Sequence, residues 1–303
     1  MKVFITGASG FIGKHVIKAV NRAGHKIVAS RLVNDKTENT QNNIQWLYAD
    51  LADLESFKPI LKYFNPDVVI HLAWEGIPNF SKANSKMNLD NSIYLLDYIL
   101  NNTICKKILV SGSCWEYGKK QGVCNECDPV NIDSYFTWAK NSLNQYLSLK
   151  CIEEGVILNW FRIFYLYGPG QREKSLIPTL IKSIRKSEIP QIYTPMNKND
   201  FIYVEDVAAA FARAVNVDLP SGIYNLGSGY GSKVYDVCRI VEKELFGSEN
   251  ISAKVLENGL KAEKVNFWSE MAKTQQALSM TFDTSLKDGI SQHILSMNLE
   301  AIT

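Results

Sequence analysis

Residues 3–20 of the chain read VFITGASGFIGKHVIKAV. The apolar run before the first glycine is typical of a short buried strand, and the apolar residues after Gly10 recur at helical spacing. The glycines between the two elements predict a turn. Strand, glycine-rich turn and helix, in this order, open a unit that binds a dinucleotide. We therefore expect an α/β fold with a Rossmann-type, doubly wound parallel sheet.

Each glycine of the turn has a role in this interpretation. Gly7 allows the tight turn, Gly10 lets the backbone approach a pyrophosphate, and Gly13 lets the helix pack closely on the sheet. The phosphates would face the N–H groups at the start of the helix. The spacing G-x-x-G-x-x-G departs by one place from G-x-G-x-x-G, and it suits short-chain dehydrogenases better than long-chain ones. The alternative is a tight turn that binds nothing.

The composition is that of an ordinary globular protein, with 303 residues, 46% hydrophobic residues, a net charge of +2 and a pI of about 8.1. No long run of lysine and arginine suggests nucleic acid or a membrane surface, so we expect a small-molecule ligand. The glycine turn begins close to Met1, which leaves no room for a signal peptide, and no apolar run is long enough to span a membrane. We therefore expect a cytoplasmic protein.

The six cysteines are expected to be reduced thiols rather than a disulfide framework. Only Cys124 and Cys127 have a spacing typical of metal ligands. One such pair without a second pair or a nearby histidine is weak evidence for zinc, so we expect no metal site.

The exit of the second expected strand, residues 25–30, bears on the choice of cofactor. A fold that prefers NAD usually places Asp or Glu there to hold the ribose 2′-hydroxyl. This chain has Ser30 and Arg31, whose hydroxyl and guanidinium suit a 2′-phosphate, and Asp35 lies too far along to replace the acid. We expect NADP (as NADPH) and consider NAD the less favoured alternative, in which Arg31 is a solvated loop residue.

Two further apolar runs extend the expected sheet. A third strand over 44–48 leads to Asp50 and Leu51, and the nearly continuous apolar run 68–73 is typical of a central parallel strand. Trp74 follows this run, at the carboxyl end of the strand, where ligands bind in open α/β sheets. Asp50 either accepts a hydrogen bond from the adenine amino group or caps a helix.

Another buried strand, 107–111, leads into SGSCWEYG (111–118), and DSYFTWAK (133–140) opens a long helix. With these motifs the chain resembles the extended short-chain dehydrogenases/reductases of the NAD-dependent epimerase/dehydratase family, which act on nucleotide-linked sugars. The matching pieces follow the family's order over most of the chain: GASGFIG (7–13), Asp50-Leu51, His71-Leu72-Ala73, Tyr117-Gly118, Asn125-Glu126 with Pro129, Tyr167-Gly168-Pro169-Gly170, and the stretch 200–207.

The resemblance implies a catalytic set of a serine or threonine, a tyrosine, and a lysine four residues after the tyrosine. The lysine lowers the tyrosine pKa and holds the nicotinamide ribose, the tyrosine exchanges a proton with the sugar oxygen, and the hydroxyl residue positions that oxygen. Ser113 and Lys140 match the first and last roles. Phe136 occupies the tyrosine place, and its ring has no hydroxyl to exchange a proton.

Phe136 has three explanations. We favour a Tyr-to-Phe change made to trap a substrate complex, because Ser113, Lys140 and the glycine turn are intact. The second is a shifted geometry that uses Tyr135, although one helical step rotates a side chain by about 100°. The third is a natural, non-catalytic NADP-binding regulator. On the first explanation, the chain binds its ligands but turns over about 10²–10⁴-fold more slowly than with tyrosine.

The residues after Ser113 exclude two branches of the family that the chain resembles. Cys114 and Trp115 stand where the 4,6-dehydratases carry an acid and a base, and enzymes that invert C3 and C5 need a cysteine at the place of Trp115. Reduction at C4 and 4-epimerisation remain. A reductase exchanges NADPH at each turnover, whereas an epimerase retains NAD. Ser30 and Arg31 therefore favour reduction of the C4 keto group of a nucleotide-linked 4-keto-6-deoxysugar for deoxyhexose biosynthesis. We favour a dTDP sugar, with CDP or GDP as alternatives.

Residues 1–165, with a returning segment near 200–216, are expected to form the NADP-binding Rossmann domain. Residues 166–303 are expected to form mainly a smaller α+β lobe that binds the substrate. Arg172 is a candidate ligand of the pyrophosphate, because a guanidinium matches phosphate in a bidentate manner. The resemblance also implies a homodimer through the helices that contain Ile93 and Leu143.

The expected site residues fall into two sets. Those that bind the cofactor are Gly7, Ser9, Gly10, Phe11, Ile12, Ser30, Arg31, Asp50, Leu51, Leu72, Ala73, Trp74, Ser111, Lys140 and Phe164. Those that bind the substrate are Trp74, Ser113, Cys114, Trp115, Phe136, Arg172 and Lys198, of which Lys198 lies close to the position where the family often has arginine.

Overall fold

The computed structural model describes residues 1–32, 43–258 and 265–300, so Asp35 lies outside the described residues. Seven parallel strands form the central sheet, and the chain winds outward from β1 in both directions, as expected for a doubly wound fold. From edge to edge the order is β11 (Gly222–Leu226), β7 (Ile157–Ile163), β5 (Lys107–Ser113), β4 (Val68–His71), β1 (Lys2–Thr6), β2 (Lys26–Arg31) and β3 (Ile44–Tyr48).

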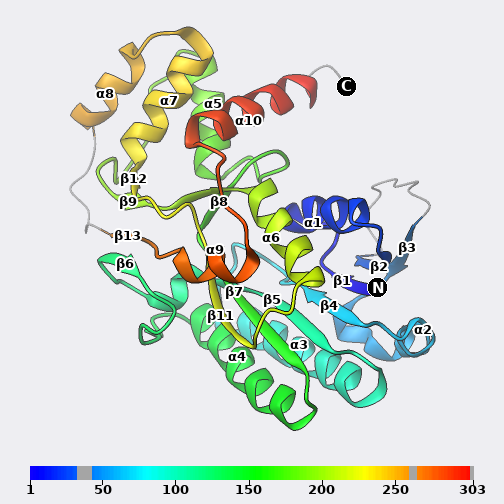
Figure 1. Cartoon of the computed structure of the whole chain (residues 1–303). Helices are drawn as coiled ribbons and strands as arrows, with labels where there is room; N and C mark the ends of the chain where they lie inside the picture. The colour runs from blue at the N-terminus through cyan, green and yellow to red at the C-terminus, as the bar shows by residue number, and fades with distance from the viewer. Residues whose placement is uncertain (33–42, 259–264, 301–303) are drawn as a thin grey trace.

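Helices cover both faces of this sheet (Figure 1). One face packs against α1 (Phe11–Arg22) and α6 (Val204–Asn216), and the other packs against α3 (Lys82–Asn102) and α4 (Tyr135–Glu153). Successive side chains of a strand point to opposite faces. In β1, Val3 and Ile5 accordingly belong to the first core and Phe4 to the second. Burial on both faces explains why the central strands are apolar throughout.

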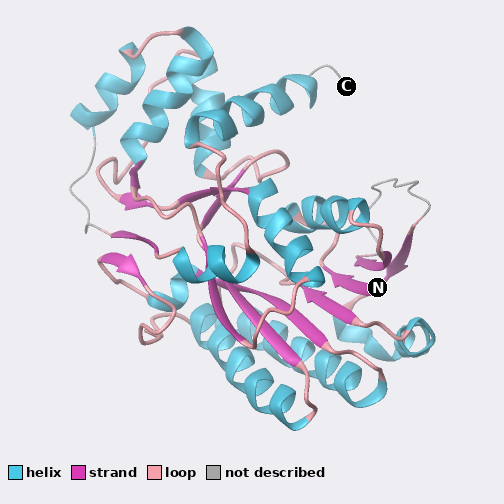
Figure 2. Cartoon of the chain, in the orientation of Figure 1, coloured by secondary structure: helices cyan, strands magenta, loops and turns pink. Residues whose placement is uncertain are grey.

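A smaller lobe stands above the carboxyl edge of the sheet and has its own apolar core (Figure 2). Its helices are α5 (Leu176–Arg185), α7 (Val234–Phe246), α8 (Asn250–Asn258) and α10 (Leu286–Glu300). Its short strands are β8 (Tyr165–Tyr167) paired with β10 (Phe201–Tyr203), and the sheet β12 (Ser232–Lys233), β9 (Lys198–Asn199), β13 (Asn266–Ser269) and β6 (Gly122–Cys124).

The C-terminal half of the chain returns to the main sheet more than once. The returning helix α6 is held there by Lys107, whose ammonium donates hydrogen bonds to the carbonyls of Ala214 (2.9 Å) and Val217 (2.6 Å) at the end of the helix. After α6, β11 joins the sheet beside β7, and α9 (Ala272–Leu278) packs near it. The sequence analysis expected only the segment near 200–216 to return.

After β3 the chain forms a short 3₁₀ segment, η1 (Leu51–Ser56), and then α2 (Lys58–Phe64). The strands β6, β9, β12 and β13 were not expected from the sequence. Strands of two to four residues are too short to show a period, and tertiary pairing decides them.

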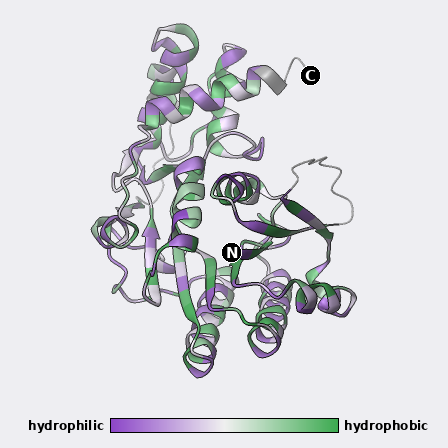
Figure 3. Cartoon of the chain, turned by 45° about the vertical axis from the view of Figure 1, so that its right-hand side comes forward, coloured by the Kyte–Doolittle hydropathy of each residue, from purple (hydrophilic) through white to green (hydrophobic). Residues whose placement is uncertain are grey.

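Figure 3 shows bands of hydrophobic and hydrophilic residues alternating along the helices, as expected for helices with one buried face. In the part of the chain that the structure describes, no helix combines the length and apolarity needed to cross a bilayer.

Candidate active site

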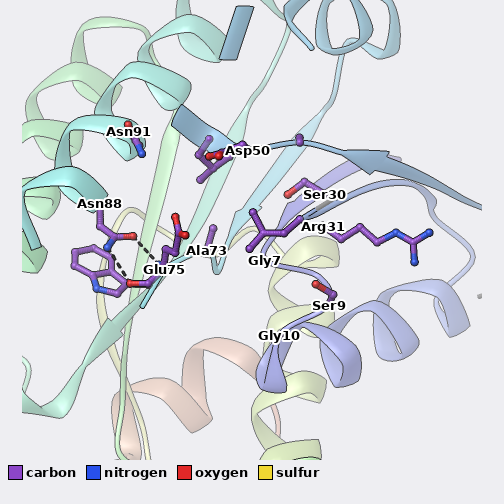
Figure 4. Close-up of a pocket in the computed structure, with 14 residues that line it drawn as sticks. Gly7, Ser9, Gly10, Ser30, Arg31, Asp50, Ala73, Glu75, Asn88 and Asn91 are labelled. Carbon is purple, nitrogen blue, oxygen red and sulfur yellow. Dashed lines mark hydrogen bonds between the residues drawn. The ribbon is translucent and has the colours of Figure 1, made fainter. Parts of the chain in front are cut away.

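A cleft of about 190 Å³ opens at the carboxyl ends of β1, β2 and β4 (Figure 4). This is the edge where ligands bind in open α/β sheets. Nine residues expected to bind the cofactor line it: Gly7, Ser9, Gly10, Ser30, Arg31, Asp50, Leu51, Ala73 and Trp74. The structure therefore brings together residues from four segments of the sequence.

The glycine turn is packed too tightly for side chains at two of its positions. Gly7 has a φ of +64°, and a Cβ there would lie 2.8 Å from the backbone of Ala73. A Cβ on Gly13 would lie 2.2 Å from the carbonyl oxygen of Gly7. The turn therefore lies against the end of β4, and α1 lies against the turn.

The N-terminus of α1 suits an anion. Gly10 is its N-cap and offers no side-chain hydrogen bond, and the first turn contains no acidic residue. The N–H groups of a first helical turn have no partner within the helix and carry a partial positive charge. With Ser9 and Gly10 lining the cleft, this end of the helix is placed to receive a pyrophosphate.

Arg31 lies at the rim of the cleft, at the end of β2. Its guanidinium is 4.8 Å from the ring centroid of Trp46 and 4.4 Å from that of Tyr48, and it donates a hydrogen bond to the Tyr48 hydroxyl. In Figure 4 its side chain extends away from Asp50 and Ala73. Stacking on two rings orders the cation at the rim.

Asp50 has the capping role that the sequence allowed, and its contact with adenine stays a prediction. One carboxylate oxygen accepts a hydrogen bond from the Ala52 amide (2.8 Å) and caps η1, while the residue also lines the cleft.

The cleft ends at Trp74, and Lys140 lies directly beside this side chain. The Lys140 ammonium is 4.1 Å from the Trp74 ring centroid and donates a hydrogen bond to the Ser111 carbonyl (2.8 Å). Burial lowers the pKa of this ammonium to about 7, although the Glu116 carboxylate opposes the shift. A cation from α4 is thus placed at the ends of β4 and β5, next to the cleft.

Phe136 is the centre of a cluster of four aromatic rings. Its ring centroid lies 4.8 Å from that of Phe80, 5.4 Å from that of Trp74 and 6.0 Å from that of Trp115. Tyr135 is half exposed and lines a different hollow, together with Ile132 and Trp138. Its side chain therefore lies outside the aromatic cluster around Phe136.

Ser113 ends β5 and begins η2 (Cys114–Tyr117) in a capping box. Its hydroxyl oxygen accepts a hydrogen bond from the Trp115 amide (3.2 Å), and its own amide donates to the Glu116 carboxylate (2.8 Å). Accepting a bond leaves the hydroxyl proton available to a ligand.

Comparison with known proteins agrees with this geometry. The model of the NAD-dependent epimerase/dehydratase family matches residues 3–227. The chain belongs to this family. Its members are nucleotide-sugar enzymes of the oxidoreductase type that use a nicotinamide cofactor.

Two relatives and one solved structure illustrate the similarity. The dTDP-6-deoxy-L-talose 4-dehydrogenase (NAD(+)) of Aggregatibacter actinomycetemcomitans is 26% identical over 259 residues, 84% of this chain and 93% of the relative. The CDP-abequose synthase of Salmonella muenchen is 26% identical over 261 residues, 83% of each chain. The UDP-glucose 4-epimerase of Thermotoga maritima, solved with UDP-glucose, has the same fold, with a TM-score of 0.86 at 22% identity over 99% of this chain and 100% of that chain.

Several residues that the family resemblance suggested do not line the cleft. Phe11, Ile12, Leu72, Ser111, Lys140 and Phe164 are absent from its wall, and Lys140 reaches its end only through Trp74. Cys114 is buried in a small apolar cluster with Tyr117, Cys124, Phe164 and Phe267. Arg172 is exposed, and Lys198 is partly buried in β9. Their roles toward cofactor and substrate stay predictions.

Five further residues of the cleft were not predicted from the sequence. Leu32, Ala49, Glu75, Asn88 and Asn91 also line the cleft. Asn88 accepts a hydrogen bond from the Glu75 amide (2.7 Å), the contact drawn in Figure 4. The sequence contains no clear signal for Asn88, because α3 also buries the polar residues Ser85 and Ser92. Phe80 had no signal, because only the fold brings it to Phe136.

Among the described residues, no group of three or more His, Cys, Asp and Glu side chains is arranged to hold a metal ion. Cys124 is buried and Cys127 is exposed.

Proposed function

We propose that this chain is an NADP(H)-dependent reductase for the C4 keto group of a nucleotide-linked 4-keto-6-deoxysugar. In this role it serves deoxyhexose biosynthesis, and it is slowed by phenylalanine at position 136. The observation that carries the proposal is the Lys140 ammonium beside Trp74, at the end of the cleft that begins with the glycine turn. This is the geometry needed to hold the nicotinamide end of a dinucleotide.

Different residues in and beside the cleft bind different parts of the cofactor. The N-terminus of α1 holds the pyrophosphate, Ser30 and Arg31 hold the 2′-phosphate, and Lys140 holds the hydroxyls of the nicotinamide ribose. When bound, NADPH supplies the hydride. Ser113 donates a hydrogen bond to the C4 carbonyl oxygen and orients it.

The proton is the part of the reaction that this chain lacks. Reduction of a ketone places negative charge on the C4 oxygen, and an acid within hydrogen-bond reach speeds the step by about 10²–10⁴-fold. The Phe136 ring is in the tyrosine place, surrounded by three other rings. Without a hydroxyl there, we expect slow turnover.

The aromatic cluster also bears on the sugar. The rings of Phe80, Trp115 and Phe136 make an apolar surface, against which a 6-methyl group leaves no polar group unpaired. The names of the talose dehydrogenase and the abequose synthase point to dTDP and CDP sugars respectively. We favour a dTDP sugar and keep CDP and GDP sugars as alternatives.

The test is Phe136→Tyr with NADPH and a panel of dTDP-, CDP- and GDP-linked 4-keto-6-deoxysugars. We expect NADPH oxidation to become about 10²–10⁴-fold faster with one nucleotide series. Phe80→Tyr is the matched control, because it adds a hydroxyl elsewhere in the same cluster and should bring no gain. Equal rates for Phe136→Tyr and the parent chain would show that the tyrosine hydroxyl is not the missing group.

A 4-epimerase with tightly bound NAD is the second candidate, favoured by the likeness to a putative UDP-glucose 4-epimerase of Methanocaldococcus jannaschii, 26% identical over 301 residues. It predicts that NAD stays bound through purification and that 4-epimers interconvert without NADPH oxidation. Cofactor binding without turnover in either assay, even with tyrosine at position 136, would instead indicate a regulator.

A further inference from the structure

A buried ion pair lies behind the end of β5, and no step described above uses it. Glu116 and Arg162 are each about 1% exposed, and the Arg162 Nε–H donates to the carboxylate at 2.9 Å. The Trp160 indole also donates to this carboxylate, at 3.0 Å. Such a pair is costly to desolvate and gives little net stability compared with apolar residues of the same size. Its position suggests a further role.

The pair is packed directly against the strand end that carries the reacting groups. The Ser113 amide donates to Glu116 (2.8 Å), and two residues earlier the Ser111 carbonyl accepts from Lys140 (2.8 Å). A Cβ on Gly112, between them, would lie 2.2 Å from the Trp160 Nε1 atom and 2.8 Å from a Glu116 carboxylate oxygen. A shift of Glu116 would therefore move Ser113 and the carbonyl that holds Lys140.

The charge of Glu116 also acts on Lys140. Burial disfavours the ammonium form and lowers its pKa, and the Glu116 carboxylate is the charged group that opposes this shift. His71, on β4, also faces Lys140. Burial, reinforced by the Lys140 charge, lowers the His71 pKa to about 3, so this imidazole is neutral and offers Lys140 no counter-charge.

We propose that Glu116 is a positioning residue of this site: it holds the β5 end that presents Ser113 and the carbonyl that binds Lys140, and its carboxylate favours the charged lysine that binds the nicotinamide ribose. The inference rests on the proposed function, in which Lys140 holds that ribose. It does not require turnover, because cofactor binding alone reports the charge of Lys140.

The test measures NADPH affinity against pH, by nicotinamide fluorescence, in the parent chain and in Glu116→Gln. Affinity should fall as pH rises through the Lys140 pKa, because the neutral amine binds the ribose hydroxyls and nearby phosphates less well. Glu116→Gln removes the favourable charge and leaves Arg162 unpaired. We expect the midpoint of this fall to move to lower pH by about one unit.

Glu126→Gln is the matched control. Glu126 is also buried and accepts a hydrogen bond from the Asn225 amide (3.0 Å), but it is not among the charges that act on Lys140. Its removal should lower thermal stability without moving the midpoint. If Glu116→Gln also lowers stability and leaves the midpoint in place, Glu116 is only structural and the inference is overturned.

A second variant covers the case in which Glu116→Gln does not fold. Glu116→Gln combined with Arg162→Met leaves no unpaired buried charge. The midpoint should still move to lower pH, because Lys140 has lost its negative neighbour, and an unmoved midpoint contradicts the inference. If the parent chain itself binds no nicotinamide cofactor, this result contradicts the proposed function. It is therefore distinguishable from an unmoved midpoint, which contradicts only the inference about Glu116.

Discussion

The two ends of the cleft are built in different ways. At the cofactor end, Gly7, Ser9 and Gly10 come from one continuous segment, and backbone geometry does most of the work. At the reaction end, where we expect the chemistry, Trp74 follows β4 and lines the cleft, while Ser113 on β5 and Lys140 on α4 lie outside its wall. The expected chemistry there depends on side chains. We therefore expect a change of backbone at the cofactor end to disrupt the fold. A changed side chain at the reaction end should instead remove the chemistry and leave the fold intact.

The largest effect should come from Gly13→Ala, at the cofactor end. The new Cβ would meet the Gly7 carbonyl oxygen at 2.2 Å, and backbone cannot move aside as a side chain can. We expect a loss of about 3 kcal/mol or more in the free energy of unfolding, measured with urea, together with lost NADPH binding.

The control for this change is Gly24→Ala, because Gly24 has a φ of +81° but no atom within 4 Å of the added Cβ. It should cost only the strain of the left-handed conformation, about 1–2 kcal/mol. Equal losses of stability for Gly13→Ala and Gly24→Ala would contradict the tight backbone packing at the cofactor end.

Lys140→Met should separate function from fold at the reaction end. Burial holds the Lys140 pKa at about 7 against an ordinary value of 10.5. Between these two pH values the folded chain binds fewer protons than the unfolded chain, so the parent chain should gain stability as pH rises through this window. The variant should lose that slope and be more stable than the parent by a few kcal/mol at and below about pH 7, while its NADPH binding is weakened.

Urea unfolding across this pH range checks the Lys140→Met prediction. If the free energy of unfolding of the parent chain does not change between about pH 7 and 10.5, the Lys140 ammonium is not a buried, destabilising charge.

Arg31→Ala is expected to have a smaller effect, confined to one cofactor. Removing charge-assisted hydrogen bonds to a 2′-phosphate should weaken NADPH binding by about 10–100-fold and leave NADH binding almost unchanged. Arg22→Ala, which removes an exposed arginine at the end of α1, serves as the control. Equal affinity of the parent chain for the two cofactors would show that Ser30 and Arg31 do not select NADP.

The smallest effect should come from Tyr135→Phe. Tyr135 is half exposed and outside the aromatic cluster, so its hydroxyl should contribute less than about twofold to NADPH oxidation. A large loss of activity would instead support the shifted geometry that uses this residue at the reaction end.

Much of the cofactor end could be predicted because its signals are local. The glycine turn, the Ser30-Arg31 exit and Asp50 all follow strands whose apolar runs are visible in the sequence, and the structure gathers them around one cleft. The reaction end was predicted only in part. Ser113 and Lys140 were predicted through a motif and their roles stay predictions, whereas Phe80 and the pairing of Glu116 with Arg162 had no local pattern.

The sequence by itself determined the fold class and the approximate places of the strands β1 to β5, because the periodicity of apolar residues and the placement of glycines are properties of short segments. The tertiary structure alone decided which side chains meet. It placed three aromatic rings around Phe136, kept Tyr135 out of that cluster, and paired Glu116 with Arg162 behind the β5 end that holds Lys140. The ring contacts and the pairing of Glu116 with Arg162 join residues far apart in the chain, and only the folded structure brings them together.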